Sequence, residues 1–184
     1  MKEIRIHGRG GQGVVIAAEL LVTAFIKGGK HAAGFPFFGS ERRGAPVRAF
    51  VRFDEAPIRE KSQVYSPDCL LLMDPRQLTS PDVFVGLRHQ GMLVANHAHE
   101  MKFESPRNLE LIGVVDATRI ALQEIGISVP NTCMVGAFAA TTGWVKKDVI
   151  LEAIGAFFSG TQLEKNLRCA ERGFESVEIR REIN

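Results

Sequence analysis

A glycine-rich hexapeptide near the start of the chain constrains the fold most strongly. It reads Gly8-Arg9-Gly10-Gly11-Gln12-Gly13, follows a strand-like segment at residues 3–7 and opens an apolar, helix-like segment at residues 12–27. Glycines at the first, third and sixth positions permit a tight turn, close approach of the backbone to a diphosphate, and packing of the helix on its strand. The helix start adds free N–H groups and a partial positive charge. The pattern predicts an open α/β sheet and a phosphate-binding turn made by Gly8, Gly10, Gly11, Gln12 and Gly13. The alternative is a turn that serves only strand-to-helix packing.

Strand-like and helix-like segments alternate along the rest of the chain. Strands are expected at residues 3–7, 30–35, 45–53, 69–74, 91–96 and 109–115. Helices are expected at residues 12–27, 75–88, 116–125, 131–144, 147–158 and 161–175. The apolar segments before Asp74 and Asp116 suit central strands, and both aspartates suit helix N-caps. No linker or repeat divides the sequence, so residues 1–184 are expected to form a single three-layer α/β/α domain around a parallel or mixed sheet of about six strands.

Two features of the sequence do not decide what covers the sheet and its helices. In the first strand, Ile4 and Ile6 alternate with Glu3, Arg5 and His7, whereas a central parallel strand is normally apolar on both faces. Either the sheet is mixed and partly open, or a partner covers the charged face. The helices at 12–27 and 131–144 are apolar around most of their circumference, which indicates burial inside the chain or in a subunit interface.

Composition excludes several classes of function. The 23 Lys and Arg residues against 21 Asp and Glu give a net charge of +2, too balanced for a nucleic-acid partner. Cys69, Cys133 and Cys169 are scattered, which fits neither an iron–sulfur nor a zinc framework and indicates reduced, cytoplasmic cysteines. The segment at 97–100, His-Ala-His-Glu, lacks metal-site spacing. No membrane span, signal segment, metal site or catalytic side chain is predicted.

The segment after the first helix bears on the type of ligand. A nicotinamide dinucleotide site would need an acidic residue about 20 positions beyond the glycines. The first acid there is Glu41, and Arg42 and Arg43 follow it at once. Because arginine binds phosphate through a planar fork of donors, this pair suits a third phosphate, as in coenzyme A or NADP. The arginines could equally pair with Glu41 or with a partner subunit.

These motifs together resemble the gamma subunit of 2-oxoacid:ferredoxin oxidoreductases, the group that includes pyruvate:ferredoxin oxidoreductase. The resemblance spans nearly the whole chain. It rests on GRGGQGVV at 8–15, FPFFGSERRGAPVRAFVRF at 35–53, SQVYSPDCLLLMDP at 62–75, NTCMVGAF at 131–138 and EKNLRCAERGFE at 164–175.

The resemblance implies one subunit of an enzyme that decarboxylates a 2-oxoacid, reduces ferredoxin and forms an acyl-CoA. Thiamine diphosphate and the iron–sulfur clusters would lie on partner subunits of the alpha, beta and delta types. The gamma subunit would be a Rossmann-like domain associated with coenzyme A, held by the glycine turn at 8–13 and by Arg42 and Arg43. The form ERRGAPV at 41–47 looks more like the pyruvate and branched-chain enzymes than the 2-oxoglutarate or indolepyruvate enzymes. The rival hypotheses are a stand-alone NADP-binding reductase and a purely structural subunit.

Overall fold

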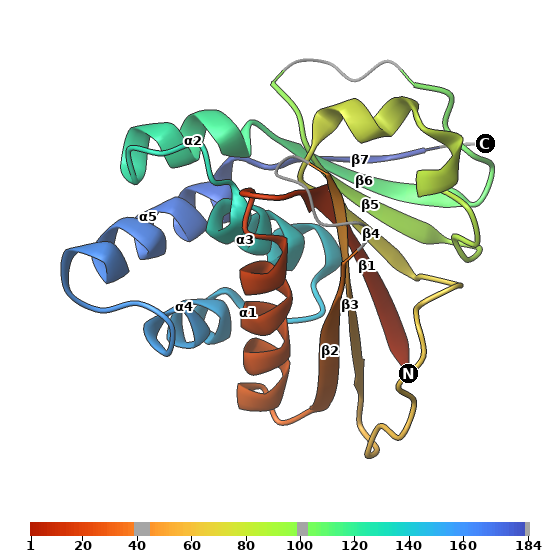
Figure 1. Cartoon of the computed structure of the whole chain (residues 1–184), viewed down its shortest axis with the longest axis horizontal. Coiled ribbons are helices and arrows are strands. Elements are labelled where there is room, and N and C mark those ends of the chain that lie inside the picture. The colour runs from red at the N-terminus through yellow and green to blue at the C-terminus, as the bar shows by residue number, and fades with distance from the viewer. Residues whose placement is uncertain (39–44, 99–102, 183–184) are drawn as a thin grey trace.

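A seven-stranded mixed sheet runs through the computed structural model, which describes the chain apart from residues 39–44, 99–102 and 183–184. Its strand order is β2-β3-β1-β4-β5-β6-β7 (Figure 1). The strands are β1 (Lys2–Arg9), β2 (His31–Phe38), β3 (Pro46–Asp54), β4 (Cys69–Leu72), β5 (Gly91–Asn96), β6 (Leu109–Val115) and β7 (Glu178–Arg181). Strands β1, β4, β5 and β6 are parallel, β3 is antiparallel to β1 and to β2, and β7 is antiparallel to β6. The predicted α/β class with a mixed sheet is confirmed.

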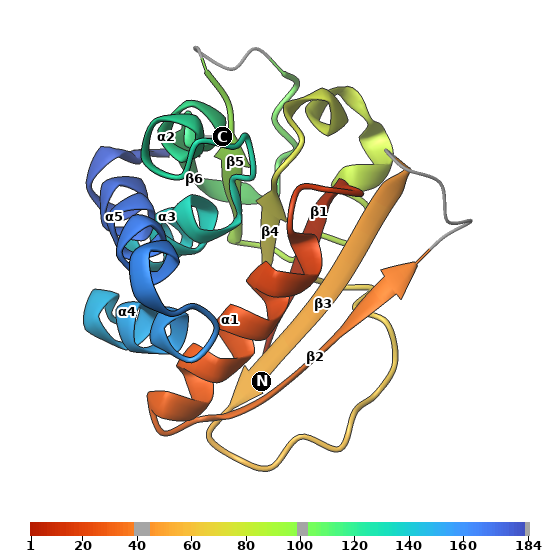
Figure 2. The ribbon, with the colours of Figure 1, turned by 60° about the vertical axis from the view of Figure 1, so that its left-hand side comes forward.

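The α-helices cover one face of this sheet, as both ribbon views show (Figures 1 and 2). They are α1 (Val14–Lys27), α2 (Ala117–Glu124), α3 (Asn131–Thr142), α4 (Lys147–Gly155) and α5 (Gly160–Ser176). The larger apolar core lies between these helices and the sheet. Among the helices of the described residues, none combines the length and apolar character that crossing a membrane requires.

Two short 3₁₀ helices, η1 (Pro75–Thr79) and η2 (Pro81–Val83), cover part of the opposite face over a smaller core. The prediction of a single α-helix at residues 75–88 is therefore wrong. Pro81 has no backbone N–H and disfavours helical geometry at the residue before it, and Ser80 is extended, at φ −90° and ψ 117°. Asp74 caps η1 as predicted, accepting a hydrogen bond from the Arg76 backbone N–H. Asp116 likewise caps α2.

Strand β7 has no counterpart in the sequence prediction. Its four residues are exposed, and Ile179 is the only apolar one, so neither alternation nor an apolar run marks it. It becomes a strand because α5 returns the chain to the free edge of β6, where Ile179 pairs with Gly113. The remaining predicted strands and helices are present, with ends shifted by a few residues.

The charged face of β1 is buried by the chain itself. Glu3 accepts hydrogen bonds of 2.8 Å from Arg52 Nε and from Arg88 Nη2. Arg5 Nη2 donates at 2.7 Å to the carbonyl of Val83, the last residue of η2, and at 2.8 Å to the carbonyl of Val85. Arg5 Nε donates to His7 Nε2 at 3.0 Å. Of the two expectations for this strand, the mixed sheet is the one observed. Covering this face requires no partner subunit, because the chain supplies its polar contacts.

Helix α3 is buried within the chain over nearly its whole length. A Cβ atom at Gly136 would lie 2.0 Å from the carbonyl oxygen of Ala170, so the backbones of α3 and α5 are in direct contact. The internal-burial alternative therefore holds for this helix. Helix α1 is buried along one side, while Glu19, Ile26 and Lys27 remain exposed.

Candidate functional site

The glycine turn lies at the carboxyl end of β1, beside β4. From β1 the chain passes through α1 to β2 on one side of the sheet, whereas β4 is followed by β5 and β6 on the other side. In open α/β sheets, ligands bind at such a switch point, outside the carboxyl ends of the strands. The fold therefore places the turn where an α/β protein of this kind holds its ligand (Figure 2).

Hydrogen bonds fix the turn to itself and to the sheet. The Gln12 side-chain oxygen accepts from the Arg9 backbone N–H at 2.8 Å, and the Gln12 N–H donates to the Arg9 carbonyl at 3.1 Å. The Gly10 N–H donates to the Ala45 carbonyl at 3.2 Å. The Gln12 amide oxygen thus closes the turn.

The first turn of α1 is open toward this site. Its N-cap, Gly13, has φ +75° and offers no side chain to the free N–H groups, and the first turn contains no acidic residue. A Cβ at Gly13 would lie 2.6 Å from Asn131 Nδ2, so the start of α3 packs directly against the turn. Gly11, at φ +95°, is exposed, and no described residue comes within 4 Å of the position that its Cβ would take. The uncapped N–H groups and the helix dipole favour an anion here.

A buried carboxylate organises the basic side chains beside the turn. Asp74 is 1% exposed and forms ion pairs with Arg9 and, at 3.2 Å, with Arg76. Burial by itself would raise the pKa of Asp74, but the hydrogen bonds from Arg9 and Arg76 outweigh burial and lower it. The Asp74 carboxylate thus holds two guanidinium groups, those of Arg9 and Arg76, beside the turn.

The predicted site residues divide into two groups. The structure brings Gly8, Gly10, Gly11, Gln12 and Gly13 together in one turn. Arg42 and Arg43 lie outside the described residues, but Ala45, just beyond them in the chain, is the residue bonded to Gly10.

The described residues give little support to a metal site at residues 97–100 or to a reactive cysteine. His97 lines a polar pocket of about 230 Å³ at the end of β6, together with Asp116, Arg119 and Arg172. His99 and Glu100 of the same motif lie outside the described residues, and within the described part of the chain no cluster of His, Cys, Asp or Glu could hold a metal ion. The three cysteines are buried and free. Burial raises the pKa of the Cys69 thiol, which makes it a poor nucleophile.

Comparison with known proteins settles the family. The family model described as pyruvate ferredoxin/flavodoxin oxidoreductase matches residues 3–176. The chain belongs to this family. It is 45% identical over 182 residues to the pyruvate/ketoisovalerate oxidoreductases common subunit gamma of Pyrococcus furiosus, covering 97% of this chain and 98% of that protein. It is 44% identical over 178 residues to pyruvate synthase subunit PorC of Methanothermobacter thermautotrophicus, covering 97% of each chain. The crystal structure of pyruvate oxidoreductase subunit PORC from Thermotoga maritima superposes with a TM-score of 0.84 at 36% identity, covering 97% of each chain.

The resemblance stated from the sequence motifs is confirmed: the chain is a gamma-type subunit of a 2-oxoacid:ferredoxin oxidoreductase. As a member of the family it is part of an oxidoreductase that acts on an oxo group and passes electrons to an iron–sulfur protein.

Sequence reasoning missed Arg9, Arg76 and Gln77 at the candidate site of this oxidoreductase subunit. Gln77 Nε2 donates to the Gly8 carbonyl at 3.0 Å, while its Oε1 is buried and has no hydrogen-bond partner among the described residues. An orphaned acceptor of this kind marks a position where a water molecule or ligand is expected. Arg9 was visible inside the glycine motif. Arg76 and Gln77 fell in the segment wrongly expected to be an α-helix.

Proposed function

We propose that this subunit binds the phosphate groups of coenzyme A and presents the thiol to the catalytic centre on neighbouring subunits. The enzyme would convert pyruvate or a branched-chain 2-oxoacid to the acyl-CoA, with partners of the alpha, beta and delta types. Thiamine diphosphate and iron–sulfur clusters on those partners would supply the decarboxylation and the electron path to ferredoxin. The observation that carries the proposal is the uncapped helix start at Gly13, set at the switch point of the sheet.

Geometry and charge support a polyanionic ligand. The free N–H groups of the first turn of α1 would receive the diphosphate, and Gly11 leaves room for a close approach. Arg9 and Arg76 add positive charge at the rim. Arg43 comes two residues before Ala45 in the sequence, and two residues of chain span at most about 7 Å. Because the Ala45 carbonyl is bonded to Gly10, this connection favours Arg42 and Arg43 as ligands of the 3′-phosphate.

The chemical contribution of this chain is positional. Anchoring the nucleotide end at a fixed point restricts the thiol to a small volume near the partner subunit, which reduces the entropic cost of its encounter with the acyl group. No proton transfer or covalent step is assigned to a residue of this chain.

The test uses the assembled complex and compares coenzyme A with its 3′-dephospho form. We expect the double substitution Arg42→Ala with Arg43→Ala to raise the KM for coenzyme A about tenfold or more, since a charge-assisted hydrogen bond contributes about 1.5–3 kcal/mol. The KM for the 2-oxoacid should stay constant. The parent complex should prefer coenzyme A over the dephospho form, and the variant should not.

A matched control removes the same charge from an exposed loop, by Arg59→Ala with Lys61→Ala. This control should leave both KM values unchanged. An unchanged affinity for coenzyme A in the Arg42/Arg43 variant and in Gly11→Val, measured by calorimetry, would point to a purely structural subunit. Tight NADPH binding by a complex that ignores coenzyme A would favour the reductase hypothesis.

A further inference from the structure

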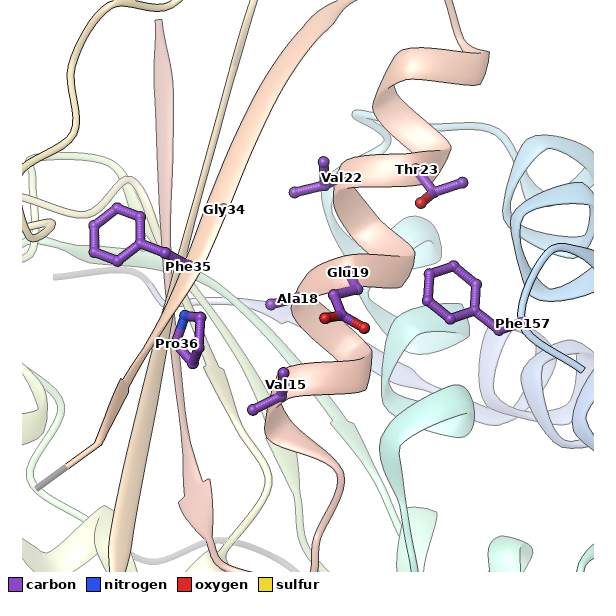
Figure 3. A pocket seen from close by; sticks show the side chains of 9 residues that line it. All are labelled: Val15, Ala18, Glu19, Val22, Thr23, Gly34, Phe35, Pro36 and Phe157. Carbon is purple, nitrogen blue, oxygen red and sulfur yellow. The ribbon is translucent and has the colours of Figure 1, made fainter. Parts of the chain in front are cut away.

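An apolar groove of about 250 Å³ runs along α1, from Val15 in its first turn to Thr23. Its walls are α1, the edge strand β2 and the loop after α4, which contributes Phe157 (Figure 3). Val15 and Val22 project from α1 on the side that faces β2, and Pro36 stands opposite them on the strand. Val15, Val22 and Phe157 are only half-buried, so the described part of the chain does not fully cover this apolar surface.

Glu19 is the one charged side chain among the described residues that line the groove. Glu19 is exposed on α1 between Ala18 and Phe157, and it takes part in no ion pair with any described residue. A carboxylate without a partner on an apolar surface attracts a cation and repels a phosphate. The groove therefore has the opposite charge preference from the glycine turn, which argues against coenzyme A as its occupant.

The edge of the sheet favours a helix over an added strand. Among the described residues, β2 pairs only with β3, so no described strand covers its outer edge. Proline is accommodated in an edge strand where its nitrogen faces away from the sheet, so Pro36 removes a donor that an added strand would use. A helix that lies beside α1 needs no backbone hydrogen bonds from β2.

We propose that this groove binds an amphipathic helix from a neighbouring subunit of the oxidoreductase complex. Apolar side chains of that helix would fill the space between Val15, Val22 and Phe157, and a lysine or arginine on it would pair with Glu19. The inference rests on family membership as a subunit and does not depend on the coenzyme A proposal.

The test co-expresses the full chain with the other subunits of its complex and measures how much of each subunit co-purifies. Val22→Arg places a bulky cation in the groove, and we expect it to reduce assembly about tenfold or more, as loss of a central contact does at protein interfaces. Glu19→Lys should weaken assembly, and Glu19→Gln should do so less. The matched control is Leu122→Arg on α2, where the parent side chain is 56% exposed and lies outside the groove.

Two further measurements keep the outcomes distinct. Circular dichroism and the thermal midpoint of each purified variant establish that it is folded before its assembly is scored. The KM for coenzyme A in whatever complex forms should match that of the parent, which separates this proposal from the coenzyme site. Normal assembly of Val22→Arg and Glu19→Lys would overturn the proposal, as would a dimer of this chain alone that Val22→Arg dissociates.

Discussion

Substitution of Gly136 by alanine should destabilise the chain strongly, because α3 and α5 touch through their backbones at this point. The added Cβ would lie 2.0 Å from the Ala170 carbonyl oxygen and 2.8 Å from its carbonyl carbon. Ordinary contact begins at about 3.4 Å. The obstacle is backbone on a neighbouring helix, which cannot rotate aside as a side chain can. The two helices must separate by more than an ångström or distort.

The expected cost follows from two opposing effects. Overpacking a core costs about 1–3 kcal/mol and sometimes more, and a backbone clash of this depth belongs at the upper end. Alanine is better than glycine in a helix by about 1 kcal/mol, which offsets part of the cost. The net loss in unfolding free energy should be about 2 kcal/mol. Urea unfolding of the purified chain, followed by circular dichroism, measures it as a lower midpoint at constant slope.

Gly155→Ala is the matched control. Gly155 is also helical, in α4, but nothing lies within 4 Å of the position its Cβ would take. That substitution should stabilise the chain by up to about 1 kcal/mol. If Gly136→Ala were neutral, or stabilising like Gly155→Ala, the close approach of α3 to α5 would be refuted.

Two other substitutions test the buried titratable side chains of β1, His7 and Glu3. Burial, reinforced by the charges of Arg5 and Arg48, lowers the pKa of His7 from 6.5 to about 3. His7 therefore stays neutral in the folded chain. Its contribution to the unfolding free energy is complete above pH 6.5 and declines as the pH falls toward 3. His7→Gln should therefore reduce the slope of unfolding free energy against pH by up to about 1.4 kcal/mol per pH unit in that window. Glu3→Gln leaves Arg52, which is 2% exposed, without its carboxylate, and it should lower the unfolding free energy measured in urea by about 3 kcal/mol. The control Glu175→Gln removes the carboxylate of an exposed ion pair and should lower it by less than about 1 kcal/mol. Equal costs for the two would contradict the burial of the Glu3 pair.

The glycine turn shows how much of the candidate site was predictable. Its residues are contiguous, and their meaning depends only on the strand before them and the helix after them, so local pattern was enough to predict the turn and its place in an α/β sheet. The contacts of Gly13 with Asn131, of Gly10 with Ala45 and of Gln77 with Gly8 join distant segments. No local pattern marks them.

The sequence by itself determined the glycine turn, the family and most of the strands and helices, because these depend on local periodicity and on contiguous motifs. Tertiary structure decided which surfaces are buried, which strand edges are paired and which surfaces remain uncovered. It buried the charged face of β1 under η2, turned the nearly featureless residues 178–181 into an edge strand, and left the groove between α1 and β2 uncovered. The physical reason is that burial and pairing depend on which distant segments meet, and periodicity along the chain does not carry that information.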